Sequence, residues 1–189
     1  MPNHVTNIVR AKPHVLARIL DPENRVDFEL ILPMPEGIHR GDHTWGEHYP
    51  NGSWLDWRPE NWGTKWNAYG QNGGQKNPSE LRFDTAWKHP QPVIEALSKE
   101  FPDEEIRVAY ADEDTGYNLG VYAVRNGQIT REHPLTKGSP EAENLACLIR
   151  LGVTSKQRND EWECEPEERA GELDERFDPF DLIKDHADD

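Results

Sequence analysis

The residues best suited to chemistry gather in one polar and aromatic block, 61–69, which reads Asn-Trp-Gly-Thr-Lys-Trp-Asn-Ala-Tyr. Its Lys65 and Tyr69 could exchange protons with a carboxylate, and Asp84 lies beside the end of a predicted strand. General acid–base catalysis needs such groups within hydrogen-bond reach of each other and of a substrate. Because spacing along the chain does not set that geometry, we predict no catalytic residue.

The same block can be interpreted as a binding surface. It holds Trp62 and Trp66, and six of the seven tryptophans fall within 45–87. Indole faces beside a lysine could stack an unpaired base or a peptide side chain. The structural interpretation is favoured, because indoles at helical spacing usually pack against a core, with Lys65 extended over one of them. The binding candidates in the block are Trp62, Lys65, Trp66, Asn67 and Tyr69.

Three histidines upstream of the block, His39, His43 and His48, lie close enough in sequence to suggest a divalent metal site. Their spacing fits no zinc motif, and the glycines among them argue against a helix that would bring two of them to one face. Solvated loop histidines are the favoured interpretation, and the metal site is the alternative. We predict no cofactor.

The chain is strongly acidic, and the acidity is concentrated at its carboxyl end. The formal net charge is −15, and 160–189 contains 14 Asp and Glu against 3 Lys and Arg. With a pI of about 4.9 and no basic run longer than a pair, direct binding to duplex DNA is not expected. An acidic surface instead favours a protein partner, such as a nucleic-acid-binding enzyme whose basic groove accepts carboxylates in place of phosphates.

The acidic tail supplies the remaining binding candidates. Glu167 and Glu168 lie in a segment that is either a helix or an extended acidic stretch, and Phe177 and Phe180 mix apolar anchors with acids, as docking peptides do. Two alternatives stay open. The tail could only keep the protein soluble, or its apolar residues could fold back onto the domain.

Composition also bounds the cellular setting. No apolar run approaches the roughly 20 residues of a membrane-spanning helix, and the first residues lack the pattern of a secretory signal. Two cysteines, Cys147 and Cys164, are too few for a zinc ribbon or a disulfide scaffold. We therefore expect a soluble, cytoplasmic protein without a membrane partner.

Hydrophobic periodicity predicts the elements that must position these residues. Strands are expected at 4–9, 26–32, 81–87, 105–111, 117–124 and 127–131, and helices at 13–20, 90–101 and 139–151. Asn126-Gly127 is a strong hairpin turn. Ser139 is the expected N-cap of the last helix, with Pro140 at its first position and Gly152 as its stop.

The order strand-helix-strand, twice, predicts an α+β fold: a ferredoxin-like split βαβ sandwich with an added β-hairpin, an extra C-terminal helix and an acidic tail. The domain should span 1–133 and carry an inserted Trp- and His-rich loop at 37–80. A helical extension at 134–159 and the tail at 160–189 should follow. We expect the helices to cover one face of the sheet.

Four segments make this chain similar to the YubB-type ferredoxin-like family. They are 1–7 (Met-Pro-Asn-His-Val-Thr-Asn), 61–68, 83–87 (Phe-Asp-Thr-Ala-Trp) and 92–98, in that order. The resemblance covers roughly residues 1–125 and nothing beyond 135. It implies a setting in bacteriophages, prophages and conjugative plasmids, and no particular reaction.

The sequence thus predicts a non-catalytic interaction protein of a mobile genetic element, a modulator of a host nucleic-acid-processing or defence system. The alternative is a metal- or small-ligand-dependent enzyme that uses the loop histidines and a Trp62/Trp66 pocket.

Overall fold

A five-stranded antiparallel sheet organises the chain. The structure, a computed structural model, describes residues 2–44, 47–71, 74–152 and 177–184. The strand order is β2-β1-β3-β4-β5, and β2 and β3 flank β1 on its two sides, so the chain from β2 through α3 (Gln91–Glu100) to β3 makes one split βαβ crossover. The strands are β1 (His4–Arg10), β2 (Glu80–Ala86), β3 (Ile106–Asp112), β4 (Leu119–Arg125) and β5 (Gln128–Glu132). This confirms the predicted α+β class.

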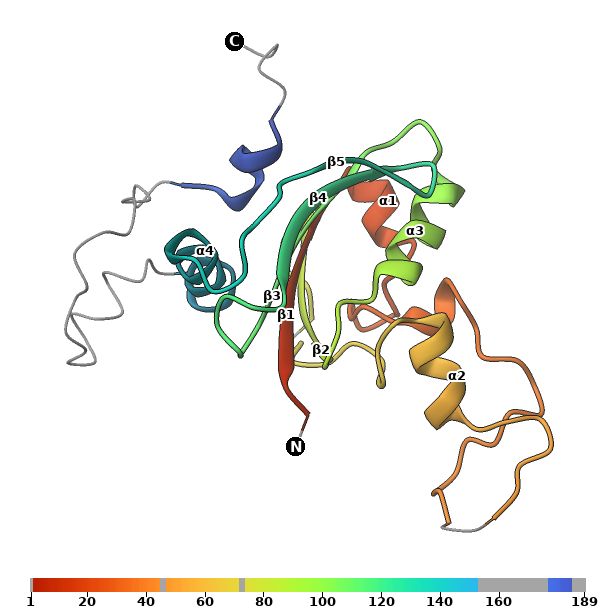
Figure 1. Cartoon of the computed structure of the whole chain (residues 1–189). Helices are drawn as coiled ribbons and strands as arrows, with labels where there is room; N and C mark the ends of the chain where they lie inside the picture. The colour runs from red at the N-terminus through yellow and green to blue at the C-terminus, as the bar shows by residue number, and fades with distance from the viewer. Residues whose placement is uncertain (1, 45–46, 72–73, 153–176, 185–189) are drawn as a thin grey trace.

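Both faces of the sheet are covered. On one face, α1 (Pro13–Ala17) and α3 pack over one hydrophobic cluster, and on the other, α4 (Pro140–Leu151) and the 3-10 helix η2 (Pro179–Ile183) pack over a second (Figure 1). The expectation that helices cover one face was therefore wrong. Helix α4 of the predicted extension and η2 of the predicted tail belong to the sandwich, because the second face is apolar and needs its own cover.

The two faces differ in side-chain size. Toward α1 and α3 the sheet presents large groups such as Phe83, Val108 and Tyr122, all buried. Toward α4 and η2 it presents mainly small ones, including Ala109, Ala111 and Ala123. Small side chains let the covering elements approach the sheet closely.

Local signals in the sequence are confirmed where they are strong. Asn126 and Gly127 have φ angles of 49° and 71°, as the tight turn between β4 and β5 requires. The Ser139 hydroxyl accepts a hydrogen bond from the Ala142 N–H at 3.2 Å, and Gly152 ends α4 in the left-handed conformation. These signals are self-contained, so the rest of the fold does not override them.

The strand predicted at 26–32 does not form. In its place stands a single 3-10 turn, η1 (Phe28–Leu30), whose N-cap Asp27 accepts a hydrogen bond from the Glu29 N–H. Side chains from the insertion replace a neighbouring strand here. The Gln71 amide bonds both N–H and C=O of Val26, and the Asn67 carbonyl oxygen accepts from the Phe28 N–H at 2.9 Å. The strand was predicted because Phe28, Leu30 and Leu32 alternate and would share one face, and this prediction was wrong: Phe28 is buried, whereas Leu30 is 38% exposed and Ile31 is buried in its place.

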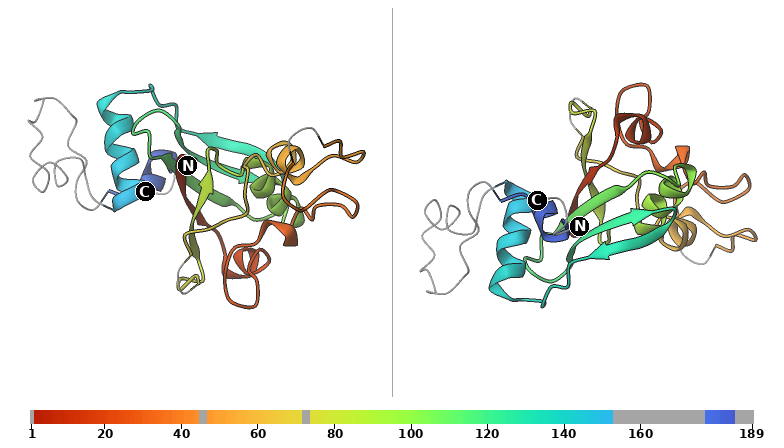
Figure 2. Two further views of the ribbon diagram at one scale, coloured as in Figure 1. Left: turned by 90° about the horizontal axis from the view of Figure 1, so that it is seen from below. Right: turned by 90° about the horizontal axis from the view of Figure 1, so that it is seen from above.

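The insertion predicted as a loop at 37–80 contains a helix, α2 (Trp54–Asn61). It begins after Ser53 and includes Pro59. Because proline usually interrupts a helix, the sequence did not predict one here. Figure 2 shows the loop before α2, and α2 itself, extending past the sheet on the side opposite α4. The Arg58 guanidinium lies 5.1 Å from the ring centroids of both Trp54 and Trp62, joining α2 to the core.

The insertion also closes the outer edge of β2. Three of its residues bond both the N–H and the C=O of alternate strand residues: Thr64 through its hydroxyl with Ala86, Tyr69 through its backbone with Asp84, and Gln75 through its amide with Arg82. Gly70 is required beside this edge, because a Cβ there would lie 2.5 Å from the Asp84 Oδ2 atom. The edge therefore offers no row of free backbone groups.

Replacing Thr64 by Val should destabilise the protein by about 1–3 kcal/mol, because the buried N–H and C=O of Ala86 would both lose their partner. Val has nearly the shape of Thr, so the loss isolates the hydroxyl. Thr64→Ser keeps the hydroxyl and should cost at most about 1 kcal/mol for its missing methyl. Urea unfolding of the three proteins measures the difference, and equal stability of the Val and Ser variants would contradict the role assigned to this edge.

Candidate functional site

Trp62 lies inside the core and is fully buried. Its indole N–H donates to the Leu32 carbonyl oxygen at 2.8 Å, and its ring packs edge-on against Phe28 and Trp57. Since α2 ends at Asn61, Trp62 and Trp66 do not share a helix face. The predicted Trp62/Trp66 pocket is therefore absent from the described part of the chain.

A surface cluster forms around Lys65 instead. The Lys65 ammonium lies 4.8 Å from the ring centroid of Trp87 and 5.6 Å from that of Trp66. Trp66 also meets the edge of Tyr69, with ring centroids 6.1 Å apart. The expectation that Lys65 extends over an indole is confirmed, but the more exposed indole is Trp87. We call Lys65, Trp66 and Trp87 the aromatic–lysine cluster.

Trp87 was not singled out from the sequence, and its backbone is unusual. It has φ = 67°, in the left-handed region that non-glycine residues rarely adopt, while its side chain is 48% exposed. The Trp87 N–H donates to the Asn3 carbonyl oxygen at 2.9 Å, and the Asn118 amide donates to the Trp87 carbonyl oxygen at 3.0 Å. Two contacts thus hold an exposed indole on a strained backbone. No sequence signal marks this, because tryptophan has no preference for the conformation.

Asn67 and Tyr69 serve the fold. The Asn67 amide donates to Asp27 at 2.6 Å while its oxygen accepts from Phe28, which leaves it little capacity for a ligand. The Tyr69 hydroxyl lies 2.9 Å from His4 Nδ1 and donates to the Thr85 carbonyl oxygen. Burial, and then the carboxylate of Asp84, raise the pKa of Tyr69 to about 12. A phenol of this pKa stays protonated at neutral pH.

The considered set of Asp84, Lys65 and Tyr69 is not assembled as an acid–base site. Asp84 Oδ1 accepts a hydrogen bond from the Thr6 hydroxyl at 2.9 Å, while the Lys65 ammonium lies over the indoles. Tyr69 meets Asp84 through backbone hydrogen bonds. Each group is engaged in a separate contact.

The three loop histidines, all among the described residues, are not arranged as a set of metal ligands. His39 stacks on Tyr49 with ring centroids 4.0 Å apart, His43 tilts against the same ring, and His48 is exposed. Within 2–44, 47–71, 74–152 and 177–184, no three His, Cys, Asp or Glu side chains are placed to hold a metal ion. The alternative of a metal site in this loop is not supported by these positions.

The binding candidates predicted in the tail fall into two groups, glutamates outside the described residues and phenylalanines inside them. Glu167 and Glu168 lie outside the described residues. Phe177 is half-buried beside the second cluster, and Phe180 is 1% exposed within it. The sequence left two interpretations of these phenylalanines, docking on a partner and folding back onto the domain. In the structure they fold back onto the domain.

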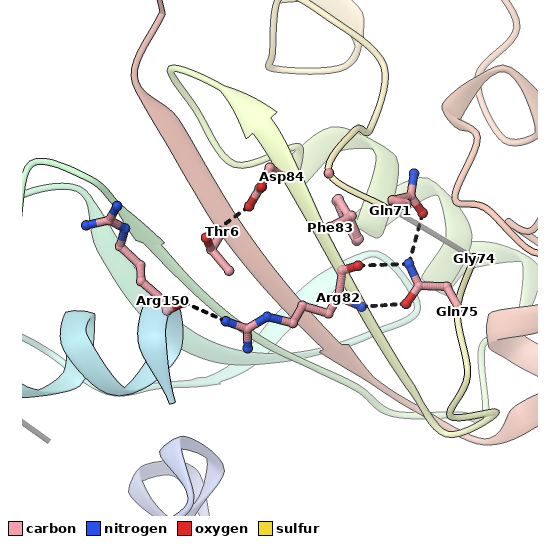
Figure 3. A pocket seen from close by; sticks show the side chains of 9 residues that line it. Thr6, Gln71, Gly74, Gln75, Arg82, Phe83, Asp84 and Arg150 are labelled. Carbon is pink, nitrogen blue, oxygen red and sulfur yellow. Dashed lines mark hydrogen bonds between the residues drawn. The ribbon is translucent and has the colours of Figure 1, made fainter. Parts of the chain in front are cut away.

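A polar hollow of about 260 Å³ lies at the outer edge of β2 beside the end of α4 (Figure 3). Its polar groups largely pair with each other, since the Arg82 guanidinium donates to the Ile149 and Arg150 carbonyl oxygens at 2.7 and 2.8 Å. Small-molecule sites usually occupy about 300–1,000 Å³ with apolar walls, so this hollow is a poor match. It is lined by Thr6, Gly70, Gln71, Gly74, Gln75, Arg82, Phe83, Asp84 and Arg150.

A buried polar chain runs through the core at His89, which sequence reasoning missed. His89 Nδ1 lies 2.7 Å from Asn7 Oδ1, and Nε2 lies 2.6 Å from the Tyr122 hydroxyl. The Asn7 oxygen can only accept, so Nδ1 carries the proton and the tyrosine donates to Nε2. His89 also stacks on Tyr110, with ring centroids 4.5 Å apart. Burial lowers the pKa of His89 to about 3, so the ring is neutral in the folded protein.

Comparison with known proteins supports the fold. Residues 61–147 match the family model described as the ferredoxin-like domain in Api92-like protein. The match runs from the end of α2 through β5 into α4, and the chain has a ferredoxin-like domain. No curated protein matches the chain, and no solved structure does.

Stability should fall as the pH drops below 6.5, because unfolded His89 binds a proton with its ordinary pKa of 6.5 and folded His89 does so only near 3. A group with a lowered folded pKa contributes stability above its unfolded pKa, and that contribution is lost on acidification. Its share is about 1.4 kcal/mol per pH unit. Between pH 6.5 and 5.0 the loss should reach about 2 kcal/mol.

The matched control is His89→Gln, whose amide can donate to Asn7 and accept from Tyr122 without titrating. Urea unfolding of both proteins across this pH range separates His89 from the other titrating groups. Parallel curves for the two proteins would show that His89 is not the neutral buried group described here.

Proposed function

We propose that this protein is a non-catalytic interaction protein of a mobile genetic element, which binds a protein partner through the aromatic–lysine cluster. The observation that carries the proposal is Trp87, an exposed indole held on a left-handed backbone. Backbone strain costs stability and persists where the surroundings enforce it, often at binding sites. Tryptophan is also among the residues enriched at the energetic centres of protein interfaces. Neither the strain nor the exposure improves the fold of the isolated chain.

The charge of the chain favours a basic partner. The formal net charge is −15, and most of it lies in 160–189, which contains 14 Asp and Glu against 3 Lys and Arg. Long-range attraction between opposite charges steers association and raises its rate. A host nucleic-acid-processing or defence enzyme, with a basic groove built for phosphates, has the required chemistry. The protein would then modulate that enzyme by occupying its groove.

The setting on a mobile element rests on the similarity of 1–7, 61–68, 83–87 and 92–98 to the YubB-type family. The ferredoxin-like domain over 61–147 is compatible with it. None of the helices described here has the length and apolar character needed to cross a bilayer.

Replacing Trp87 by Gly should abolish partner binding and leave the fold intact. Glycine adopts φ = 67° freely, so relief of about 1–2 kcal/mol of strain should offset the contacts of a half-exposed ring. The free energy of unfolding should change by less than about 1 kcal/mol, as measured by urea unfolding. Capture of partners from a bacterial lysate, identified by mass spectrometry, measures binding.

The control is Tyr117→Ala, which removes another exposed aromatic ring, 53% exposed, outside the cluster. It should retain the partners of the wild-type protein. If Trp87→Gly captured the same partners as wild type, or lost several kcal/mol of stability, the indole would serve the fold and the proposal would fail.

The role of the acidic side chains in binding is not tested cleanly by a truncation. Removing 160–189 would also remove Phe180 and Ile183 from the core, so any loss of binding could reflect unfolding. Exchange of the Asp and Glu of 160–176, Glu167 and Glu168 among them, for Asn and Gln leaves that core intact. We expect at least a tenfold weaker, less salt-dependent association with a basic partner, measured by titration at two salt concentrations. Unchanged affinity would exclude an electrostatic role for this segment.

A further inference from the structure

The short segment 177–184 docks on the second face of the sheet as a separate piece. Phe180 is 1% exposed and Ile183 is 4% exposed, and they pack with the small side chains of β3 and β4 and with α4. Ala109, Ala111 and Ala123 belong to the same buried cluster as Phe180, and we call these three alanines the alanine floor. In Figure 1 the segment lies beside α4 on this face of the sheet. We call the surface that receives it the alanine groove.

Two arginines, each beside a glutamate, lie next to Phe180 at the rim of the alanine groove: Arg10 Nε lies 2.6 Å from Glu80 Oε2, and Arg107 Nε lies 3.9 Å from Glu105 Oε1. The Arg10 guanidinium carbon lies 4.5 Å from the Phe180 ring centroid, and that of Arg107 lies 5.9 Å from it. Arg10 also pairs with the Asp178 carboxylate through a hydrogen-bonded ion pair. The groove thus recognises a carboxylate and an aromatic ring two residues apart.

The segment brings its own conformation. Asp178 accepts a hydrogen bond from the Phe180 N–H at 3.1 Å, Asp181 accepts from the Asp178 N–H at 3.4 Å, and together they form a capping box. Among the described residues, its backbone hydrogen bonds stay within the segment. Side chains alone attach it to the sheet, so it can leave without breaking any strand pairing.

We propose that the alanine groove is a peptide-binding site, occupied in cis by 177–184, and that it accepts an acidic peptide of a partner protein with the same anchors. The peptide carries an Asp, a Phe two residues later and an Ile three residues after that, matching Asp178, Phe180 and Ile183. The Arg10 guanidinium, which pairs with Asp178, selects the acid, and the alanine floor selects the ring. This surface uses none of the residues of the aromatic–lysine cluster, so the two proposals stand independently.

Covalent attachment makes the cis segment a competitor. A tethered ligand typically acts at an effective concentration on the order of 1 mM, so a free peptide binds wild-type protein only weakly. Phe180→Ala removes the main anchor from the competitor and should open the groove. A fluorescent peptide with the sequence of 177–184 serves as the probe, and fluorescence anisotropy measures its binding to the full chain.

We expect Phe180→Ala to bind the probe at least tenfold more tightly than wild type, and the probe to raise the melting temperature of this variant. A probe with its Phe replaced by Ala should not bind, and adding Arg10→Gln to Phe180→Ala should weaken binding at least fivefold. Equal binding by wild type and Phe180→Ala, or equal binding of the two probes, would overturn the proposal.

Two further measurements keep the test decisive. If Phe180→Ala does not fold, Asp178→Asn keeps the buried ring and removes the charge that pairs with Arg10, and it should bind the probe more tightly than wild type. Size-exclusion chromatography of wild type at high concentration tests a different occupant. A dimer that disappears in Phe180→Ala would mean that a second copy of the chain fills the groove, which would overturn the partner peptide.

Discussion

The open edge of β2 is the constraint on which much of this structure depends. An edge strand has a row of unpaired N–H and C=O groups, and here side chains satisfy much of it where another strand would normally lie. The Thr64 hydroxyl and the Gln75 amide each bond an N–H and a C=O of the same strand residue, as a neighbouring strand would. Gln71 does the same for Val26 and bonds Gln75, which links the two stretches of chain. Thr64, Gln71 and Gln75 are therefore structural.

This use of the insertion separates its residues into two groups. Trp62, Thr64, Asn67 and Tyr69 are engaged by the core or by backbone groups, whereas Lys65 and Trp66 turn toward the surface and meet Trp87. Trp87 follows β2 directly, so the strained backbone occurs where the strand leaves the sheet. The interface we propose thus lies on a rigid support, as an aromatic anchor requires, because little side-chain entropy is lost on binding.

The two faces of the sheet are packed in different ways. The face toward α1 and α3 encloses the neutral His89 with Asn7 and Tyr122, a polar chain whose groups satisfy one another and so tolerate burial. The opposite face has an alanine floor and takes its last covering element from near the end of the chain. Among the described residues that element has no backbone hydrogen bond to the sheet, which is why we propose the second face as the part of the core whose cover can be exchanged.

The sequence by itself determined the elements whose signals are local. The cap at Ser139, the stop at Gly152, the turn at Asn126-Gly127 and the strand alternation in β1, β2 and β3 need only neighbouring residues, so they could be predicted. The α+β class and the ferredoxin-like domain followed from their order. Tertiary structure decided everything that depends on distant partners. Phe28 lies in a turn because Asn67 bonds its N–H, Trp62 is buried while Trp87 is exposed, and Phe180 returns to the sheet because Arg10 and an alanine floor receive it. Such choices are set by contacts between residues far apart in the chain, which hydrophobic periodicity does not encode.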